Sequence, residues 1–187
     1  TLLFRGEEIF ADNTDGVGLM RDIQLNLGIP LINKRVLLLG AGGAAQGVLY
    51  PLLEQKPSLL HIANRTKEKA AVFITTPALA NVIGSTQIQA KGFDELTNQQ
   101  YDIVINATSA GLTDSELPLP ATLFAPNALA YDMMYGRETP FMKFAREHGA
   151  QVADGLGMLV EQAAEAFYLW RGVRPDTAPV IAALRNS

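Results

Sequence analysis

The chain has 187 residues, of which 48% are hydrophobic and 18% are charged, and its formal net charge at pH 7 is −4. This length is typical of one domain, the apolar fraction suffices for a packed core, and the negative charge argues against a surface for nucleic acids or anionic membranes. The absence of cysteine excludes disulfides, thiolate metal sites and cysteine nucleophiles, and His61 and His148 are too distant in sequence for a short metal motif. We therefore predict a globular protein without a metal site, and no apolar run approaches the ~20 residues that would span a bilayer.

The first residues, Thr1-Leu2-Leu3-Phe4, contain neither an initiator methionine nor the charged and apolar regions of a signal peptide. We therefore expect a piece of a longer, cytoplasmic protein, with a processed full-length protein as the alternative. Residues 1–10 predict a small hairpin that turns at Arg5-Gly6, and residues 14–27 predict a helix.

From Asn33 onward, short apolar runs alternate with amphipathic stretches. Six strands are predicted, over residues 35–39, 59–63, 87–90, 102–106, 128–132 and 151–153. Helices are predicted over residues 44–55, from 66 to about 73, from 139, over 155–171 and over 176–184. Thr139 and Pro140 have the residue types of an N-cap and of a first helical position.

Strands that are apolar throughout and separated by helices indicate an α/β fold with a parallel sheet covered on both faces. Right-handed crossovers then predict a Rossmann-like, doubly wound sheet with the strand order 3-2-1-4-5-6.

A glycine-rich loop follows the first of these strands. The segment Gly40-Ala41-Gly42-Gly43-Ala44-Ala45 fits the pattern G-x-G-x-x-A between a strand and a helix. In this pattern the first glycine permits a tight turn, the second lets the backbone approach a pyrophosphate, and the small third residue lets helix and strand pack closely. Free N–H groups at the helix start also favour phosphates. The loop predicts a dinucleotide site, and a purely structural turn is the alternative.

The residues after the second strand distinguish between two dinucleotides. NAD-binding domains usually place Asp or Glu there for the ribose hydroxyls, whereas this chain has Asn64-Arg65-Thr66-Lys67. Arg65 can face a 2′-phosphate and stack on adenine, Thr66 offers a hydroxyl at a helix start, and Lys67 and Lys69 add positive charge. The pattern favours NADP(H) over NAD, and the alternative is a solvated helix start with incidental basic residues.

The fourth strand ends in a loop of small polar residues, Asn106-Ala107-Thr108-Ser109-Ala110-Gly111, at the carboxyl edge of the sheet. Ligands of open α/β sheets bind at that edge. Small side chains there let a nicotinamide ribose approach the backbone, although an ordinary turn rich in Asn, Thr and Ser explains the composition nearly as well.

Two further segments place polar residues beside helix starts. In Asp12-Asn13-Thr14-Asp15-Gly16 taken by itself, one of the first three residues is an N-cap and Asp15 is an acid favoured in the first turn. The segment 154–162 runs from a glycine loop into an apolar helix, on which Met158 and Gln162 share a face. Taken by itself, that face indicates core packing.

Together with the other motifs, these two segments resemble the shikimate dehydrogenase family over the whole chain. The motifs that carry the resemblance are Asn13-Thr14-Asp15-Gly16, Gly40-Ala41-Gly42-Gly43-Ala44, Asn64-Arg65-Thr66, Asn106-Ala107-Thr108-Ser109, Tyr131-Asp132-Met133-Met134-Tyr135, Thr139-Pro140-Phe141 and Asp154-Gly155-Leu156-Gly157-Met158-Leu159-Val160-Glu161-Gln162. The glycine loop and Asn64-Arg65-Thr66 also recur in other NADP enzymes, whereas the combination of the first and last motifs is far more specific.

The resemblance implies an enzyme of aromatic amino-acid biosynthesis that reduces 3-dehydroshikimate to shikimate with NADPH. Asp15 matches the catalytic aspartate, which the family pairs with a lysine for proton transfer, and Tyr135 and Gln162 join Asp15 at substrate-contacting positions. Met133, Gly155 and Met158 match residues around the nicotinamide. The cofactor-binding residues expected in total are Gly40, Ala41, Gly42, Gly43, Ala44, Asn64, Arg65, Thr66, Lys69, Asn106, Ala107, Thr108, Ser109, Met133, Gly155 and Met158.

The chain departs from the family pattern at its N-terminal end. The family's catalytic lysine and its serine-containing shikimate-binding motif belong to an N-terminal domain that has no counterpart here, and the first lysine is Lys34. We therefore expect residues 1–30 to be the end of that substrate domain and a hinge helix. Residues 31–154 are then the NADP-binding domain, and residues 155–187 form helices that return toward the substrate domain. Such a chain is expected to bind NADP(H) without turning over shikimate by itself.

Two alternatives stay open. A quinate/shikimate dehydrogenase relative with relaxed cofactor choice is disfavoured by Asn64-Arg65-Thr66, and a non-catalytic NADP-binding module is disfavoured by Asp15, Tyr135 and Gln162. The expected partners are a small-molecule substrate and the missing domain. A monomer or a homodimer is expected, and exposed apolar faces on the terminal helices would favour self-association.

Overall fold

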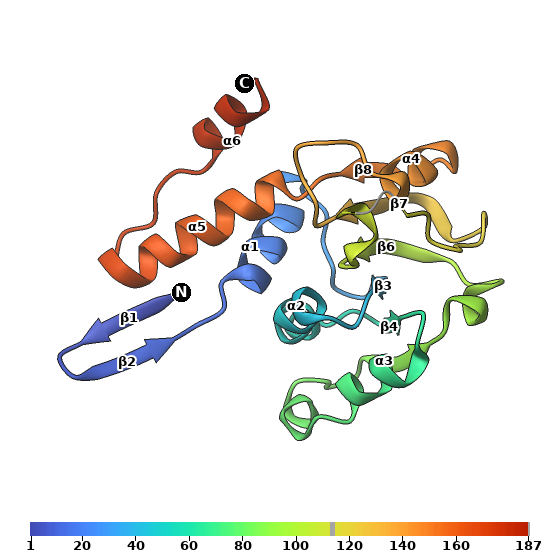
Figure 1. The fold of residues 1–187 in the computed structure, drawn as a ribbon, viewed down its shortest axis with the longest axis horizontal. Coiled ribbons are helices and arrows are strands. Elements are labelled where there is room, and N and C mark those ends of the chain that lie inside the picture. Colours follow the sequence, from blue (N-terminus) through green and yellow to red (C-terminus); the bar gives the residue numbers. More distant parts are fainter. Residues whose placement is uncertain (113–114, 187) are drawn as a thin grey trace.

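Six parallel strands form the central sheet of the protein (Figure 1). The structure is a computed structural model that describes residues 1–112 and 115–186. The strands of this sheet are β3 (Arg35–Leu39), β4 (Leu59–Ala63), β5 (Gln87–Lys91), β6 (Tyr101–Asn106), β7 (Phe124–Asp132) and β8 (Gln151–Ala153). They lie in the order β5-β4-β3-β6-β7-β8, and all neighbouring pairs are parallel. The predicted α/β class and strand order are thus confirmed.

Helices connect these strands. The α-helices are α2 (Gly43–Glu54), α3 (Lys67–Ile74) and α4 (Pro140–Glu147), and the 3-10 helices are η2 (Pro77–Asn81), η3 (Phe93–Leu96) and η4 (Ser109–Leu112). Thr139 caps α4 as its residue type predicts, because its hydroxyl oxygen accepts a hydrogen bond from the Met142 N–H at 3.2 Å. The 3-10 helices were not predicted, since one or two turns show too little apolar periodicity to be told from a loop.

Alternate residues of β3 point into two hydrophobic clusters on opposite faces of the sheet. Val36 and Leu38 belong to one cluster, while Leu37 and Leu39 belong to the other, and all four side chains are fully buried. Successive side chains of a strand point to opposite faces. A central strand between two covered faces therefore requires an apolar residue at every position, which is the pattern the sequence shows.

The first and last elements of the chain lie together on one side of the parallel sheet (Figure 1). They are the hairpin β1 (Leu2–Arg5) and β2 (Glu8–Ala11), α1 (Asp15–Arg21), α5 (Leu156–Arg171) and α6 (Ala178–Arg185). The indole Nε1 of Trp170 on α5 donates a hydrogen bond to the Leu2 carbonyl at 2.8 Å. Helix α6 buries none of its side chains.

The helix predicted over residues 14–27 has two parts. After α1 the chain continues as a π-helical segment, η1 (Asp22–Asn26), and the Leu27 N–H donates to the carbonyl of Asp22 at 3.0 Å. The Asp22 carboxylate is buried and accepts hydrogen bonds from the Tyr131 hydroxyl at 2.6 Å and from Asn26 at 2.9 Å. Because Tyr131 is 109 residues away in the sequence, no local pattern reveals this contact of Asp22.

Candidate functional site

A cleft of about 750 Å³ opens where the parallel strands end. Its volume falls within the range of small-molecule sites. The lining residues are Gly40, Ala41, Gly42, Gly43, Ala44, Asn64, Arg65, Thr66, Lys69, Phe93, Ala107, Thr108, Ser109, Ala110, Ser115, Glu116, Leu117, Pro118, Met133 and Met134. The cleft thus brings together every predicted cofactor residue except Asn106, Gly155 and Met158.

The glycine loop between β3 and α2 forms the middle of this cleft. Gly40 has a φ of +108°, and a Cβ at this position would lie 2.9 Å from the carbonyl oxygen of Ala107, so only glycine fits the turn. A Cβ on Gly42 or Gly43 would have no neighbouring atom within 4 Å. Helix α2 begins at Gly43 and has neither a side-chain cap nor an acid in its first turn. Its first N–H groups are therefore available to an anion.

Positive charge lines the end of the cleft beside β4. Arg65 and Lys69 are exposed lining residues, and within the described part of the chain neither forms an ion pair. The side-chain amide of Asn64 donates to the carbonyl of Thr66 at 2.9 Å and so shapes the turn into α3. Among the described lining residues, Glu116 is the only carboxylate.

Lys67, which the sequence also placed near this charged end, forms an ion pair instead of lining the cleft. Its ammonium pairs with Glu95 at 2.7 Å, and Lys67 does not line the cleft. The hydrogen bond to Glu95 raises the pKa of Lys67, while hydrogen bonds from the Gly92 N–H and from Lys67 lower the pKa of Glu95. The positive charge expected from Lys67 near the phosphate is therefore engaged elsewhere.

Sequence reasoning missed part of the cleft wall. The lining residues that it did not predict are Phe93, Ser115, Glu116, Leu117, Pro118 and Met134, whereas Ala110 belongs to the loop expected at this edge without being one of the expected cofactor residues. Phe93 stands just after β5, so the rule that ligands bind at the carboxyl edge could have indicated it. Residues 115–118 carry no motif, and only the folded chain places them in the same cleft as the glycine loop.

Three expected cofactor residues lie behind the cleft wall. Asn106 is 1% exposed, and its amide oxygen accepts from the N–H and the hydroxyl of Thr108 at 3.1 and 2.7 Å. The Gly155 N–H donates to the Met134 carbonyl at 2.8 Å. Met158 is a buried member of the hydrophobic core. Asn106 and Gly155 hold wall residues by these hydrogen bonds, Met158 belongs to the core, and none of the three lines the cleft.

The expected substrate residues Asp15, Tyr135 and Gln162 also do not line the cleft. Asp15 is the first residue of α1, and its backbone N–H donates a hydrogen bond to the side-chain oxygen of Asn13 at 2.9 Å. Tyr135 is 48% exposed. Gln162 lies on α5, where a Cβ on Gly18 of α1 would approach its Cβ to 2.8 Å.

Glycines in the two most specific motifs allow α1 to pack closely on its neighbours. A Cβ on Gly16 would overlap Pro51 of α2, and a Cβ on Gly157 of α5 would overlap the Asp22 carboxylate. With Gly18 facing α5, helix α1 is held between α2 and α5 at backbone contact. The close packing that these glycines allow therefore fixes the position of Asp15 on α1 relative to Gln162 on α5.

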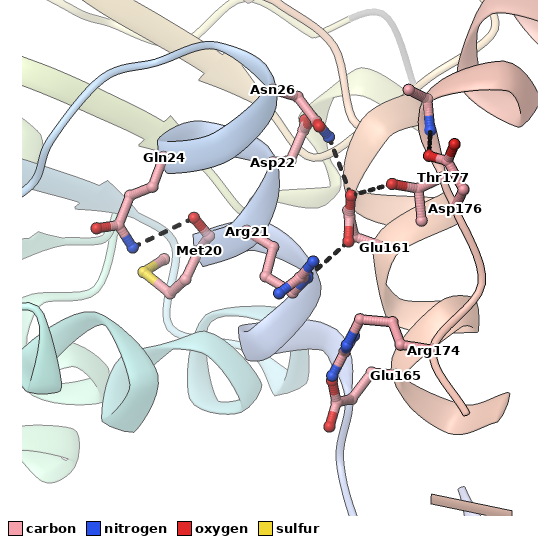
Figure 2. Close-up of polar contacts among 11 residues, drawn as sticks. Met20, Arg21, Asp22, Gln24, Asn26, Glu161, Glu165, Arg174, Asp176 and Thr177 are labelled. Carbon is pink, nitrogen blue, oxygen red and sulfur yellow. Dashed lines mark hydrogen bonds and ion pairs between the residues drawn. The ribbon is translucent and has the colours of Figure 1, made fainter. Parts of the chain in front are cut away.

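A buried carboxylate reinforces the junction of α1 and α5 (Figure 2). Glu161 is 1% exposed and accepts hydrogen bonds from Arg21 at 2.7 Å, Asn26 at 3.3 Å and Thr177 at 2.6 Å. Burial by itself would raise the pKa of Glu161, but the hydrogen bonds from Thr177, Arg21 and Asn26 outweigh it and hold the pKa below its usual value. One side chain thus joins α1, η1, α5 and the segment before α6.

The described residues contain no group of three or more His, Cys, Asp or Glu side chains that could hold a metal ion. No helix in that part of the chain combines the length and apolarity needed to cross a membrane.

Comparison with known proteins assigns the chain to a family. Residues 24–113 match the family model described as shikimate/quinate 5-dehydrogenase, and residues 155–185 match the shikimate 5′-dehydrogenase C-terminal domain. The shikimate dehydrogenase (NADP(+)) of Methylobacillus flagellatus is 65% identical over 99% of this chain and 67% of its own length.

Solved structures agree with the sequence matches. An Ael1 enzyme from Pseudomonas putida superposes with a TM-score of 0.87 at 51% identity, over 98% of this chain and 66% of that one. The shikimate 5-dehydrogenase of Thermus thermophilus in complex with NADP(H) and shikimate has a TM-score of 0.78 at 34% identity, over 99% and 66% respectively. The chain spans about two thirds of the length of these relatives. It belongs to the shikimate dehydrogenase family.

Proposed function

We propose that this chain binds NADP(H) in the cleft and is the cofactor-binding part of an enzyme that reduces 3-dehydroshikimate to shikimate. The observation that carries the proposal is the convergence, in one cleft, of the glycine loop, the Asn64–Lys69 turn and the Ala107–Ser109 loop. The relatives named for NADP(+) and shikimate support the same assignment.

The cleft residues fit the parts of the dinucleotide in order. The open space beside Gly42 and Gly43 suits a pyrophosphate at the start of α2. Arg65 and Lys69 suit the 2′-phosphate, because both are exposed cations at the end of the cleft beside β4. Bound NADPH supplies the hydride, and the protein supplies position and electrostatic environment.

The substrate is proposed to contact Asp15, Tyr135 and Gln162. Hydride addition to a ketone builds charge on its oxygen, so a proton donor must lie within hydrogen-bond reach of that oxygen. The close packing of α1 on α5 holds Asp15 and Gln162 on neighbouring helices. We place residues 1–30 and 155–187 on the side of the substrate, and residues 31–154 in the cofactor domain.

The catalytic lysine of the family is proposed to lie in the part of the relatives that this chain does not span. Lys69 is the only lysine among the described lining residues, and it stands at the β4 end of the cleft. The chain by itself is therefore expected to show no NADP⁺-dependent oxidation of shikimate in an absorbance assay at 340 nm. Measurable turnover by these 187 residues would refute this part of the proposal.

Calorimetry with NADP⁺ and NAD⁺ tests the cofactor assignment. Wild type should prefer NADP⁺, and Arg65→Ala should weaken NADP⁺ binding about tenfold, because a charged hydrogen bond at an exposed site contributes about 1.5 kcal/mol. The affinity for NAD⁺ should change little. Arg171→Ala is the matched control, since it removes the same charge from the end of α5, outside the cleft.

The outcomes separate the alternatives. Equal losses for both cofactors in Arg65→Ala would contradict the role at the 2′-phosphate. Equal wild-type affinities for NAD⁺ and NADP⁺ would favour a relative with relaxed cofactor choice.

A further inference from the structure

The side chain of Asp132 lies buried directly behind the cleft wall. Asp132 is the last residue of β7, is 0% exposed, and pairs in register with Asn106 at the end of β6. Its carboxylate accepts three hydrogen bonds, from the Met134 N–H at 3.0 Å, the Asn106 side-chain amide at 3.1 Å and the Thr139 hydroxyl at 2.5 Å. All three donors are neutral groups, and Asp132 forms no ion pair among the described residues.

This carboxylate connects two separate parts of the cleft wall. On one side, Asn106 uses its amide oxygen to hold the N–H and hydroxyl of Thr108, which lines the cleft. On the other side, Asp132 holds the N–H of Met134, which lines the cleft from the segment after β7. The backbone of that segment has two further anchors, the hydrogen bonds Met133 N–H to Asn106 carbonyl and Gly155 N–H to Met134 carbonyl.

The place of these residues in the sheet indicates which half of a dinucleotide they would meet. Arg65 and Lys69 follow β4, on one side of the glycine loop after β3, whereas Thr108 and Met134 follow β6 and β7 on the other side. A dinucleotide lies across this crevice with its pyrophosphate at the glycine loop. With the adenosine 2′-phosphate at Arg65, the nicotinamide half must then lie along Thr108 and Met134.

We infer that Asp132 is a positioning residue: it holds Thr108 and Met134 where they contact the nicotinamide half of the cofactor, and it does not touch the cofactor itself. The inference rests on the proposed function. It predicts a selective effect: loosening this wall weakens binding of the whole dinucleotide but leaves binding of its adenosine half unchanged.

Asp132→Asn is the informative substitution. The amide has nearly the shape of the carboxylate but only one acceptor oxygen. If that oxygen faces Asn106 and Thr139, the amide NH₂ meets the Met134 N–H, and if the amide is flipped, the NH₂ meets the donors of Asn106. One side of the wall therefore loses its contact in either orientation.

The test compares two ligands by calorimetry, NADP⁺ and adenosine 2′,5′-bisphosphate, which represents the adenosine half only. Asp132→Asn should weaken the binding of NADP⁺ about tenfold, which corresponds to the loss of about one hydrogen bond. The affinity for adenosine 2′,5′-bisphosphate should change by less than about twofold. Asp22→Asn is the matched control, because Asp22 is an equally buried carboxylate that lies outside the cleft. It should leave the ratio of the two affinities at the wild-type value.

Hydrogen exchange on the wild-type protein keeps the inference testable if Asp132→Asn does not fold. NADP⁺ should slow exchange of the Thr108 and Met134 amides more than adenosine 2′,5′-bisphosphate does. Equal slowing by both ligands, or an equal loss of both affinities in Asp132→Asn, would overturn the inference while leaving the proposed function intact. Failure of the wild-type chain to bind either ligand would overturn the proposed function itself.

Discussion

His61 makes the stability of the fold depend on pH in a way that can be isolated. His61 lies on β4 and is 4% exposed, and its Nδ1 lies 2.7 Å from the hydroxyl of Tyr101. Burial, and then the positive charges of Lys91 and Arg35, lower the pKa of His61 from 6.5 to about 4. The folded protein therefore holds this histidine neutral over a range of pH in which an unfolded chain would protonate it.

The sign and the size of the effect follow from proton linkage. Because the unfolded chain binds the proton first, the stability that neutral His61 contributes is complete above pH 6.5. It is lost progressively as the pH falls toward 4, where the folded ring is protonated as well. The shift corresponds to about 3 kcal/mol over this window.

Urea unfolding at a series of pH values between 7.5 and 4.5 measures this loss. The free energy of unfolding of wild type should fall with decreasing pH more steeply than that of His61→Gln, by as much as about 1.4 kcal/mol per pH unit. Tyr101→Phe should keep the steep slope, because burial and not the hydroxyl is the main cause of the lowered pKa. Parallel curves for wild type and His61→Gln would refute the reasoning.

Two further substitutions test the local geometry. Gly40→Ala should lower the free energy of unfolding by about 1–3 kcal/mol, because its φ of +108° and the Ala107 carbonyl at 2.9 Å both oppose a Cβ; a melting curve equal to that of wild type would contradict this. Glu161→Leu should cost about 3 kcal/mol by leaving Arg21 without its buried partner. Since the pKa of Glu161 is lowered in the fold, its stabilising contribution should be present above the ordinary value of 4.5 and be lost as the pH falls through the lower folded value. Unfolding of wild type and Glu161→Leu with equal dependence on acid pH would exclude that contribution.

Much of the cleft lining could be predicted from the sequence, because its signals are local. The glycine loop, the turn and helix start that contain Asn64, Arg65 and Lys69, and the loop from Ala107 to Ser109 each follow a strand whose apolar run is visible in the sequence. The carboxyl ends of parallel strands meet at one edge. Strand order followed from the handedness of the crossovers, and the structure confirms it.

Only the tertiary structure decided which buried polar side chains pair with one another. Arg21 and Glu161 are 140 residues apart, Tyr131 and Asp22 are 109 apart, and Asn106 and Asp132 are 26 apart. A polar residue in a local pattern does not reveal its partner, because a buried hydrogen bond forms only where packing brings the two groups together and removes water from both. The same limit explains three differences from the sequence-based expectations. Lys67 forms an ion pair with Glu95, Glu116 lines the cleft although no motif predicted it, and Asn106 does not line the cleft but holds Thr108, which does.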